Sequence, residues 1–312
     1  MFTVEIHATS HIGRVRKGNE DNYLVLNITG AKRWTGSQDD GEFIVESQSF
    51  EVDSNGVVIA VSDGMGGALA GEVASTMAVE TVSEQILGDD DIDKTIEPSV
   101  YEHYLINKLY EATLFANQLI HNQGRTDPQY QGMGATFTGI GITPEAADVI
   151  QVGDSRAYLV RNGKIYQVTK DQSLVQQLID AQQISEAEAE THTLKNVILQ
   201  ALGAQNEIYP VSARVTPNRD DIFLICSDGL SNKVSAGSMQ RIVQDNFDDL
   251  QNACVELIRE ANENGGEDNI TVILAKFSGE GLPAPEGDEV KLELIDLGGI
   301  HDTADQDTAE II

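Results

Sequence analysis

Residues 57–67 read VVIAVSDGMGG, a run of five apolar residues that leads into Ser-Asp-Gly. A second apolar run, IFLICSDG at 222–229, ends in the same three residues. A carboxylate at the end of a buried strand is costly unless it is exposed, paired or bound to a metal, and a following glycine lets the backbone approach closely. The repetition predicts two strands that carry Asp63 and Asp228 to a shared ligand.

Further acids stand where neighbouring strands should begin. Glu20 and Asp21 directly precede the strand expected at 22–28, and antiparallel pairing with the strand at 57–62 would place them beside Asp63. The same arrangement recurs later in the chain. Its members are the strands at 222–227 and 270–277, with Asp228, Asp268 and Asn269. Two such sheets, packed face to face, would gather four or five carboxylates at one end of a β-sandwich.

So many like charges in one cleft require raised pKa values or bound cations. Oxygen ligands without a nearby His or Cys suit Mg²⁺ or Mn²⁺ and do not resemble a zinc site. Two such ions would lower the pKa of a bridging water and orient it as a nucleophile. Arg16, within GRVRKGNED at 13–21, has a planar guanidinium that can bind two oxygens of a phosphate. The residues therefore predict a two-metal hydrolase with an anionic substrate.

The spacing of apolar residues predicts an α+β fold. Tight clusters of short strands, with Asn162-Gly163 as a hairpin turn, indicate antiparallel neighbours and no βαβ alternation. Strands are expected at 2–9, 22–28, 57–62, 135–142, 147–152, 156–161, 222–227 and 270–277, and helices at 69–87, 103–121, 172–181 and 249–262.

Composition restricts the partners. The 312 residues include 51 acidic and 20 basic residues, and the formal charge of −31 argues against nucleic acid or an anionic membrane as a partner. The N-terminus lacks the apolar core of a signal peptide, and no stretch has the roughly 18 apolar residues that a membrane helix needs. We therefore expect a cytoplasmic monomer. Cys226 and Cys254 lack metal-ligand spacing and are expected to be buried free thiols.

Two segments stand apart from this pattern. Residues 28–56 hold the single tryptophan, Trp34, and are expected to form an insertion loop at the surface, although FIV and SFEV within it could form a hairpin. Residues 278–312 contain ten acidic residues and one lysine, a net charge of −9, and are expected to be an acidic tail with at most a short docking strand. The catalytic domain is accordingly placed at 1–277.

Six motifs occur in one order along residues 2–277. They are GRVRKGNED at 13–21, SDGMGG at 62–67, GMGAT at 132–136, GDSR at 153–156, SDGL at 227–230 and EDN at 267–269. Each alone is weak, but the ordered set resembles the bacterial form of the PPM, or type 2C, family of metal-dependent serine/threonine protein phosphatases.

The resemblance implies a four-layer αββα sandwich with a dinuclear Mn²⁺ or Mg²⁺ site at one end. It also implies residue roles. Among the metal ligands, Asp63 would bridge the two ions, Gly64 would bind one through its carbonyl, Asp228 and Asp268 would hold one ion, and Glu20 would hold the other. Asp21 would support the site from the second layer, Asn269 would support water or substrate, and Asp154 would anchor a turn or support the site indirectly. Arg16 would bind the phosphoryl group of the substrate. Arg16, Asp63 and Asp228 are thus the expected catalytic residues.

The chain departs from the family pattern at two positions. Bacterial relatives can hold a third metal with an acid a few residues before the GMG motif, but Gln129 and Gln131 cannot supply that carboxylate and Asp127 lies further off, so a third metal is doubtful. Met65 stands where some members have a histidine that protonates the leaving group, so a metal-bound water would have to do so. Residues 170–205 resemble the family's flap, which is helical and overhangs the cleft.

The leading hypothesis is hydrolysis of phosphoserine and phosphothreonine in proteins, opposing a serine/threonine kinase. The alternative is a catalytically silent adaptor of the same fold that binds phosphoproteins, although such a scaffold has no need for four like charges in one cleft. An unrelated two-metal nuclease is disfavoured by the negative charge. A phosphatase of anti-sigma-antagonist proteins would usually carry sensory modules, and none is visible in the sequence.

Overall fold

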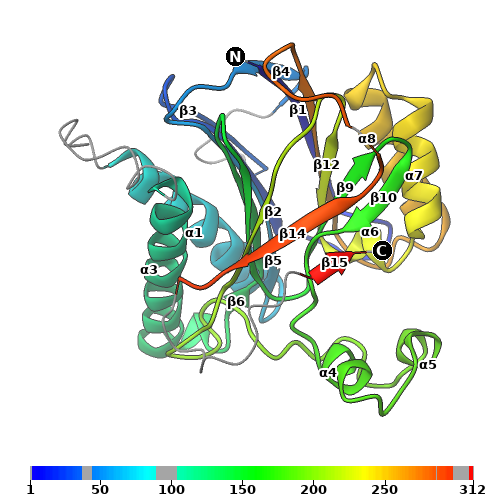
Figure 1. Cartoon of the computed structure of the whole chain (residues 1–312). Coiled ribbons are helices and arrows are strands. Elements are labelled where there is room, and N and C mark those ends of the chain that lie inside the picture. Colours follow the sequence, from blue (N-terminus) through cyan, green and yellow to red (C-terminus); the bar gives the residue numbers. More distant parts are fainter. Residues whose placement is uncertain (1, 37–43, 89–103, 286, 298–308, 312) are drawn as a thin grey trace.

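The computed structural model describes residues 2–36, 44–88, 104–285, 287–297 and 309–311. Two antiparallel sheets pack face to face, with helices on both outer faces, so the predicted four-layer α+β sandwich is confirmed (Figure 1). The strands are β1 (Thr3–His11), β2 (Asp21–Asn27), β3 (Lys32–Thr35), β4 (Gln48–Glu51), β5 (Val57–Met65), β6 (Gly134–Ala135), β7 (Phe137–Ile142), β8 (Ala147–Val152), β9 (Arg156–Arg161), β10 (Lys164–Gln167), β11 (Val211–Val215), β12 (Ile222–Cys226), β13 (Ile270–Ser278), β14 (Val290–Ile295) and β15 (Ala309–Ile311).

Helices cover the two outer faces. The helices are α1 (Ala68–Leu87), α3 (Tyr104–Thr126), the 3₁₀ turn η1 (Pro128–Tyr130), α4 (Leu174–Asp180), α5 (Glu186–Glu190), α6 (Asp228–Ser231), α7 (Ala236–Asp245) and α8 (Leu250–Glu263). Helices α1 and α3 pack on the sheet that contains β5, α6, α7 and α8 pack on the sheet that contains β12, and α4 and α5 project from the sandwich (Figure 1). None of the helices in the described ranges is long and apolar enough to cross a membrane.

The order of strands brings the two Ser-Asp-Gly segments to one end of the sandwich. One sheet runs β10-β9-β12-β13-β1-β4, and the other runs β15-β14-β11-β8-β7-β5-β2-β3, with β6 paired to β5. Both predicted antiparallel pairings are present, β2 with β5 and β12 with β13. In the first of these pairs, Asp21 lies directly opposite Asp63.

Three apolar cores hold the layers together. The central core lies between the sheets and includes Phe223, Phe277 and Ile59. A second core joins α1 and α3 to the outer face of β2, β5, β7 and β8, and a third joins α7 and α8 to β12 and β13. Side chains alternate between the two faces of β5 and β12, and both faces are buried, one in the central core and the other under helices. Consecutive positions are therefore apolar, which explains the continuous apolar runs in the sequence.

The structure corrects the expectation of a surface loop at 28–56. Within the described part, β3 pairs with β2 and β4 pairs with β1, so the insertion adds one edge strand to each sheet and the hairpin does not form. Trp34 is only 3% exposed, and its ring centroid lies 5.4 Å from that of Phe50. Residues 37–43, which include part of FIV, lie outside the described residues.

The C-terminal segment contains the expected docking strand. β14 pairs with β11 at the edge of the second sheet, and Val290 and Leu292 alternate into the central core. β15 pairs in turn with β14. The remaining acidic stretch at 298–308 lies outside the described residues. Part of the segment beyond residue 277 is therefore built into the sandwich.

Candidate active site

Asp63 is fixed at the end of β5 by the GMGAT motif. Its backbone N–H donates to Thr136 Oγ1 (2.9 Å), and its carbonyl accepts from the Thr136 N–H (2.8 Å). Gly64 follows because a Cβ there would overlap the carbonyl oxygen of Gly71, at the start of α1. The backbone of Gly64 also donates to the Glu20 carbonyl (3.1 Å), which ties β5 to the segment ahead of β2.

The second Ser-Asp-Gly has the same steric logic. Asp228 is the first residue of the short helix α6, directly after β12, and a Cβ at Gly229 would overlap the carbonyl oxygen of Asn269. The two glycines thus let a strand end approach a neighbouring backbone, and the two aspartates before them reach the same place. The side chains of Asp63 and Asp228 are close enough that each modifies the pKa of the other.

Asp21 is buried behind this pair. Its Oδ2 accepts hydrogen bonds from Ser227 Oγ (2.6 Å) and Thr271 Oγ1 (2.8 Å). Burial raises the pKa of Asp21 to about 7, although these two hydroxyl donors oppose the shift. Asp21 therefore connects β2 of one sheet to both strand ends of the other, which agrees with a supporting role.

The cluster is electrostatically strained. Burial raises the pKa of Asp63 well above its ordinary value, and the charges of Asp21 and Asp228 raise it further. Burial, followed by the charge of Asp268, raises the pKa of Asp228 to about 6. Like charges that gather in this way need protons or cations to neutralise them.

Arg16 supplies positive charge at the rim of the cluster. Its Nε lies 2.8 Å from Asp268 Oδ1, its Nη2 donates to Asp268 Oδ2 (2.9 Å), and its Nη1 lies 3.6 Å from Glu20 Oε1. The side chain of Arg16 remains 45% exposed, whereas Glu20 is buried. Burial raises the pKa of Glu20, and Arg16 opposes the shift. Arg16 thus neutralises two of the predicted metal ligands.

Asn269 positions the loop that carries Arg16. Its Oδ1 accepts from the Glu20 N–H (2.8 Å), and its Nδ2 donates to the carbonyls of Ile12 and Gly18 (both 3.0 Å). The amide group therefore clamps both ends of the 12–20 loop. Asn269 thereby holds the loop that carries Arg16 against the start of β13.

Asp154 lies at the same end of the sandwich, near the base of the flap. Burial, and then the charge of Asp228, raise its pKa to about 7. Its neighbour Arg156 forms a bidentate ion pair with Asp171 (2.7–3.1 Å), the residue just ahead of α4. The Gly153 N–H also donates to Gln172 Oε1 (2.8 Å). The GDSR turn therefore anchors the 170–205 segment beside the acids.

These residues fit divalent ions by their chemistry. Every ligand candidate is an oxygen, and the carboxylates reach each other from β5, α6, the start of β13 and the 12–20 loop. Across the described residues, no three His, Cys, Asp or Glu side chains converge closely enough to hold an ion as they stand. One physical reason is that Arg16 lies between Asp268 and Glu20, so ligation requires its guanidinium to move.

Sequence reasoning missed the hydroxyl groups that hold this site. Ser227 and Thr271 bind Asp21, and Thr136 and Ser155 bind each other (2.7 Å) beneath Asp63. A signal was available in part, because Ser227 directly precedes Asp228 and Thr271 lies two residues after Asn269, on the same side of β13.

The chain is similar to known phosphatases. It matches the family model described as Protein phosphatase 2C over residues 37–269. "Protein phosphatase PhpP" of Streptococcus pneumoniae is 38% identical over 224 residues, which cover 72% of this chain and 87% of PhpP. "Serine/threonine phosphatase stp" of Listeria monocytogenes is 33% identical over 270 residues, covering 85% of this chain and 92% of the relative.

Solved structures agree. The serine/threonine phosphatase PstP/Ppp of Mycobacterium tuberculosis superposes with a TM-score of 0.70 at 30% identity, over 89% of this chain and 100% of that one. A structure of the PstP catalytic domain in complex with two manganese ions gives a TM-score of 0.68 at 30% identity, with the same coverage. Fold and site thus define a metal-dependent protein serine/threonine phosphatase. The chain belongs to the protein phosphatase 2C family, and nothing in these relatives supports a silent adaptor.

Proposed function

We propose that the acids at this end of the sandwich hold two Mn²⁺ or Mg²⁺ ions and that this centre hydrolyses phosphoserine and phosphothreonine in proteins. The observation that carries the proposal is that buried acids of both sheets lie at one end of the sandwich: Asp21 lies opposite Asp63, and it accepts a hydrogen bond from Ser227, the residue before Asp228. When bound, two ions activate a water and neutralise charge on the phosphoryl oxygens. Gln131 offers no carboxylate for a third ion.

The residue roles follow from position. Asp63 lies where both sheets meet, so we assign it to both ions, with the Gly64 carbonyl beside it. Asp21 and Asn269 act indirectly, because each holds a neighbouring strand end or loop, and we assign Asp154 an indirect role as part of the GDSR turn, whose Gly153 N–H binds Gln172. The remaining ligands are Asp228 and Asp268 for one ion and Glu20 for the other.

Arg16 is assigned to the substrate. Its guanidinium now neutralises Asp268 and Glu20, and it is needed there only while those carboxylates lack another cation. Once they are neutralised, the half-exposed guanidinium can turn to bind two phosphoryl oxygens, for which its planar fork is suited. Arg16 thereby links filling of the metal site to capture of the phosphate.

The biological setting is also a proposal. Phosphoproteins are the substrates of the relatives' activity, and we infer that this enzyme opposes a serine/threonine kinase as a cytoplasmic monomer. The domain that acts is 1–277, with the flap at 170–205 and the strand β14 as an edge addition. Light scattering of the purified protein tests whether it is a monomer. The phosphorylation state of a co-expressed kinase tests whether the enzyme opposes that kinase.

The decisive experiment measures hydrolysis of an aryl phosphate and of a phosphothreonine peptide with Mn²⁺, with Mg²⁺ and with a chelator. We expect metal-dependent turnover in the wild type and a loss of about 10³-fold or more in Asp228→Asn, because a direct ligand is lost. Asp245→Asn is the matched control, since Asp245 is exposed at the end of α7. Folded, metal-loaded protein without turnover would overturn the proposal.

A further inference from the structure

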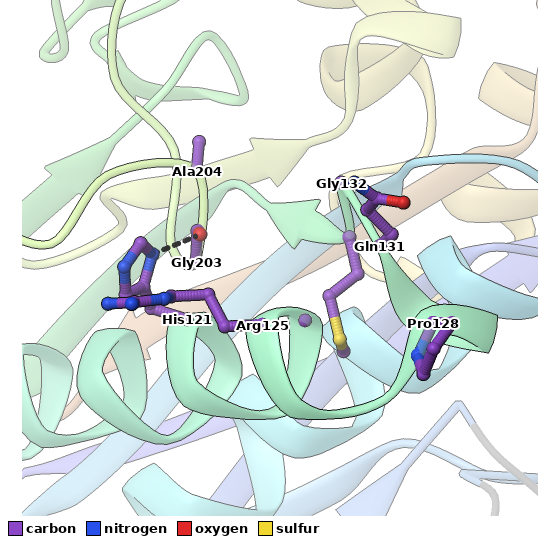
Figure 2. Close-up of a pocket in the computed structure, with 9 residues that line it drawn as sticks. His121, Arg125, Pro128, Gln131, Gly132, Gly203 and Ala204 are labelled. Carbon is purple, nitrogen blue, oxygen red and sulfur yellow. Dashed lines mark hydrogen bonds between the residues drawn. The ribbon is translucent and has the colours of Figure 1, made fainter.

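A hollow of about 480 Å³ lies between α3, the GMG segment and the end of the 170–205 segment (Figure 2). Its lining includes one permanently charged side chain, Arg125, with His121 beside it on α3, and no carboxylate is among the described residues that line it. The whole chain has 51 acidic and 20 basic residues, so a hollow with this lining runs against the composition. Its electrostatics favour an anion.

The two basic side chains are placed to act together. They lie four residues apart, on the same face of α3, and Figure 2 shows both reaching from that helix beneath Gly203 and Ala204. His121 Nδ1 lies 2.9 Å from the Gly203 carbonyl oxygen. Because a carbonyl oxygen can only accept, Nδ1 carries the proton, and the ring is fixed with Nε2 left for other contacts.

Arg125 has a free guanidinium as far as the described residues show. It is exposed, and none of the ion pairs between described residues includes it. The acid closest in sequence, Asp127, accepts a hydrogen bond from the Gln129 N–H (2.9 Å) and so caps η1. Arg125 also lies in the last turn of α3, where its positive charge interacts favourably with the negative end of the helix dipole. That structural role would affect stability but not substrate choice.

The hollow is connected to the active site by one short strand. Its lining residue Met133 is followed by β6, which pairs with the end of β5, and by Thr136, which binds the backbone of Asp63. Met133 and Thr136 are three residues apart, or about 10 Å along an extended chain. An extended substrate with its phosphoresidue at Asp63 would therefore bring a side chain about three residues away to the hollow.

We propose that this hollow is a subsite for a second oxyanion of the phosphoprotein substrate, a carboxylate or another phosphate near the phosphoresidue. The Arg125 guanidinium binds the oxyanion, the hydrogen bond to Gly203 fixes the His121 ring on the same helix face, and the open mouth beside Gln131 and Gly132 admits the oxyanion. The inference rests on the proposed phosphatase function and adds a selection rule to it. The enzyme then prefers phosphosites with an acidic neighbour, even though its own surface is strongly acidic.

The test compares phosphothreonine peptides in which a single aspartate is moved from four residues before to four residues after the phosphothreonine. We expect one or two positions to raise kcat/KM about three- to fivefold over the alanine peptide, the scale of one exposed charge contact. Arg125→Gln should remove this ratio, and Arg125→Lys should retain it. Arg259→Gln is the matched control, because Arg259 is exposed on α8 and pairs with Glu256 and Glu263.

Charge reversal sharpens the test. Arg125→Glu should invert the preference, so that a lysine at the same peptide position becomes favourable. The inference is overturned if the wild type shows no preference at any position, or if Arg125→Gln lowers turnover of acidic and neutral peptides equally. If no substrate is turned over, the proposed function fails separately. Fluorescence anisotropy of the labelled acidic peptide, with wild type and Arg125→Gln, then decides whether the subsite binds it.

Discussion

Buried acids lie in two regions of this molecule, and the regions differ in where their counter-charge comes from. Arg161 forms a bidentate pair with Asp221 (2.6 and 2.9 Å), and Arg214 pairs in the same way with Asp148 (2.7 and 2.9 Å). At the other region, Asp63 and Asp228 are buried beside further acids, which raise the pKa of both carboxyl groups. Arg16, at its rim, is an exposed partner.

The difference separates structure from function. A buried carboxylate with its own arginine has its charge compensated within the chain, and removing one partner leaves the other uncompensated. A cluster of acids whose basic partner at the rim, Arg16, is half-exposed has too little positive charge within the chain and can instead bind cations from solution. Both regions contain buried aspartates, so the distribution of cations, rather than burial, marks the active site.

The largest effect is expected at Asp63. Asp63→Asn should lower kcat/KM by about 10³-fold or more, because a ligand shared by both ions loses its charge. In chelator the same variant should be more stable than wild type, since one of several crowded carboxylates has become neutral. Turnover with Mn²⁺ and urea unfolding in chelator measure the two effects. A variant that is inactive and also less stable in chelator would contradict the comparison.

The opposite pattern is expected at Asp221. Asp221→Asn should lower the free energy of unfolding by about 3–5 kcal/mol, because it leaves the buried Arg161 without a charged partner. The kcat/KM of the folded variant should stay within about twofold of wild type. Urea unfolding and steady-state kinetics test this. Asp248→Asn is the control, because its exposed pair with Lys276 should cost less than about 1 kcal/mol. If Asp221→Asn kept its full free energy of unfolding but lost activity, the two regions would not be functionally separate.

Metal binding should stabilise only the active-site region. At 100 times the dissociation constant, Mn²⁺ should add about 2.7 kcal/mol to the free energy of unfolding. Asp221→Asn should keep this gain, and Asp228→Asn should lose most of it. Thermal melts with and without Mn²⁺ measure the gain. Equal gains in both variants would show that the ions bind elsewhere.

His7 provides a third and smaller case, a buried group that stays neutral. Burial lowers its pKa below 6.5, with the charge of Asp249 acting in the opposite direction. As the pH drops below 6.5, the unfolded chain therefore binds a proton at His7 that the folded chain does not. The free energy of unfolding then decreases by at most about 1.4 kcal/mol for each pH unit of acidification, as the contribution of this residue. His7→Gln should flatten that slope in urea unfolding at pH 5, 6 and 7. An unchanged slope would assign it to other groups.

Short-range patterns predicted most of the fold and the acids of the site. Strand ends that run into Ser-Asp-Gly showed which carboxylates meet, because antiparallel pairing places the end of one strand beside the start of the next. Helix α7 was overlooked although Met239, Ile242 and Val243 follow helical spacing and are buried. The helical spacing of these apolar residues was therefore sufficient to predict α7.

Other features depend on distant pairings that local sequence does not encode. β3 pairs with β2 across a short turn at 28–31, but β4 joins β1, whose paired residues lie more than 40 residues earlier, and nothing within 28–56 predicts that partner. Likewise, Arg161 and Asp221 are 60 residues apart and meet only through the pairing of β9 with β12. The flap's ion pair between Arg156 and Asp171 is nearer in sequence but needs the turn in between.

The single tryptophan has an optical consequence. Trp34 lies opposite Val25 on β2, with the Lys32 ammonium 4.7 Å from its ring centroid and Phe50 against it. Excitation at tryptophan wavelengths therefore observes one point of the sandwich, four residues along β2 from Asp21, or about 13 Å. A change in Trp34 emission when ions are added would therefore indicate that β2, the strand that carries Asp21, has shifted.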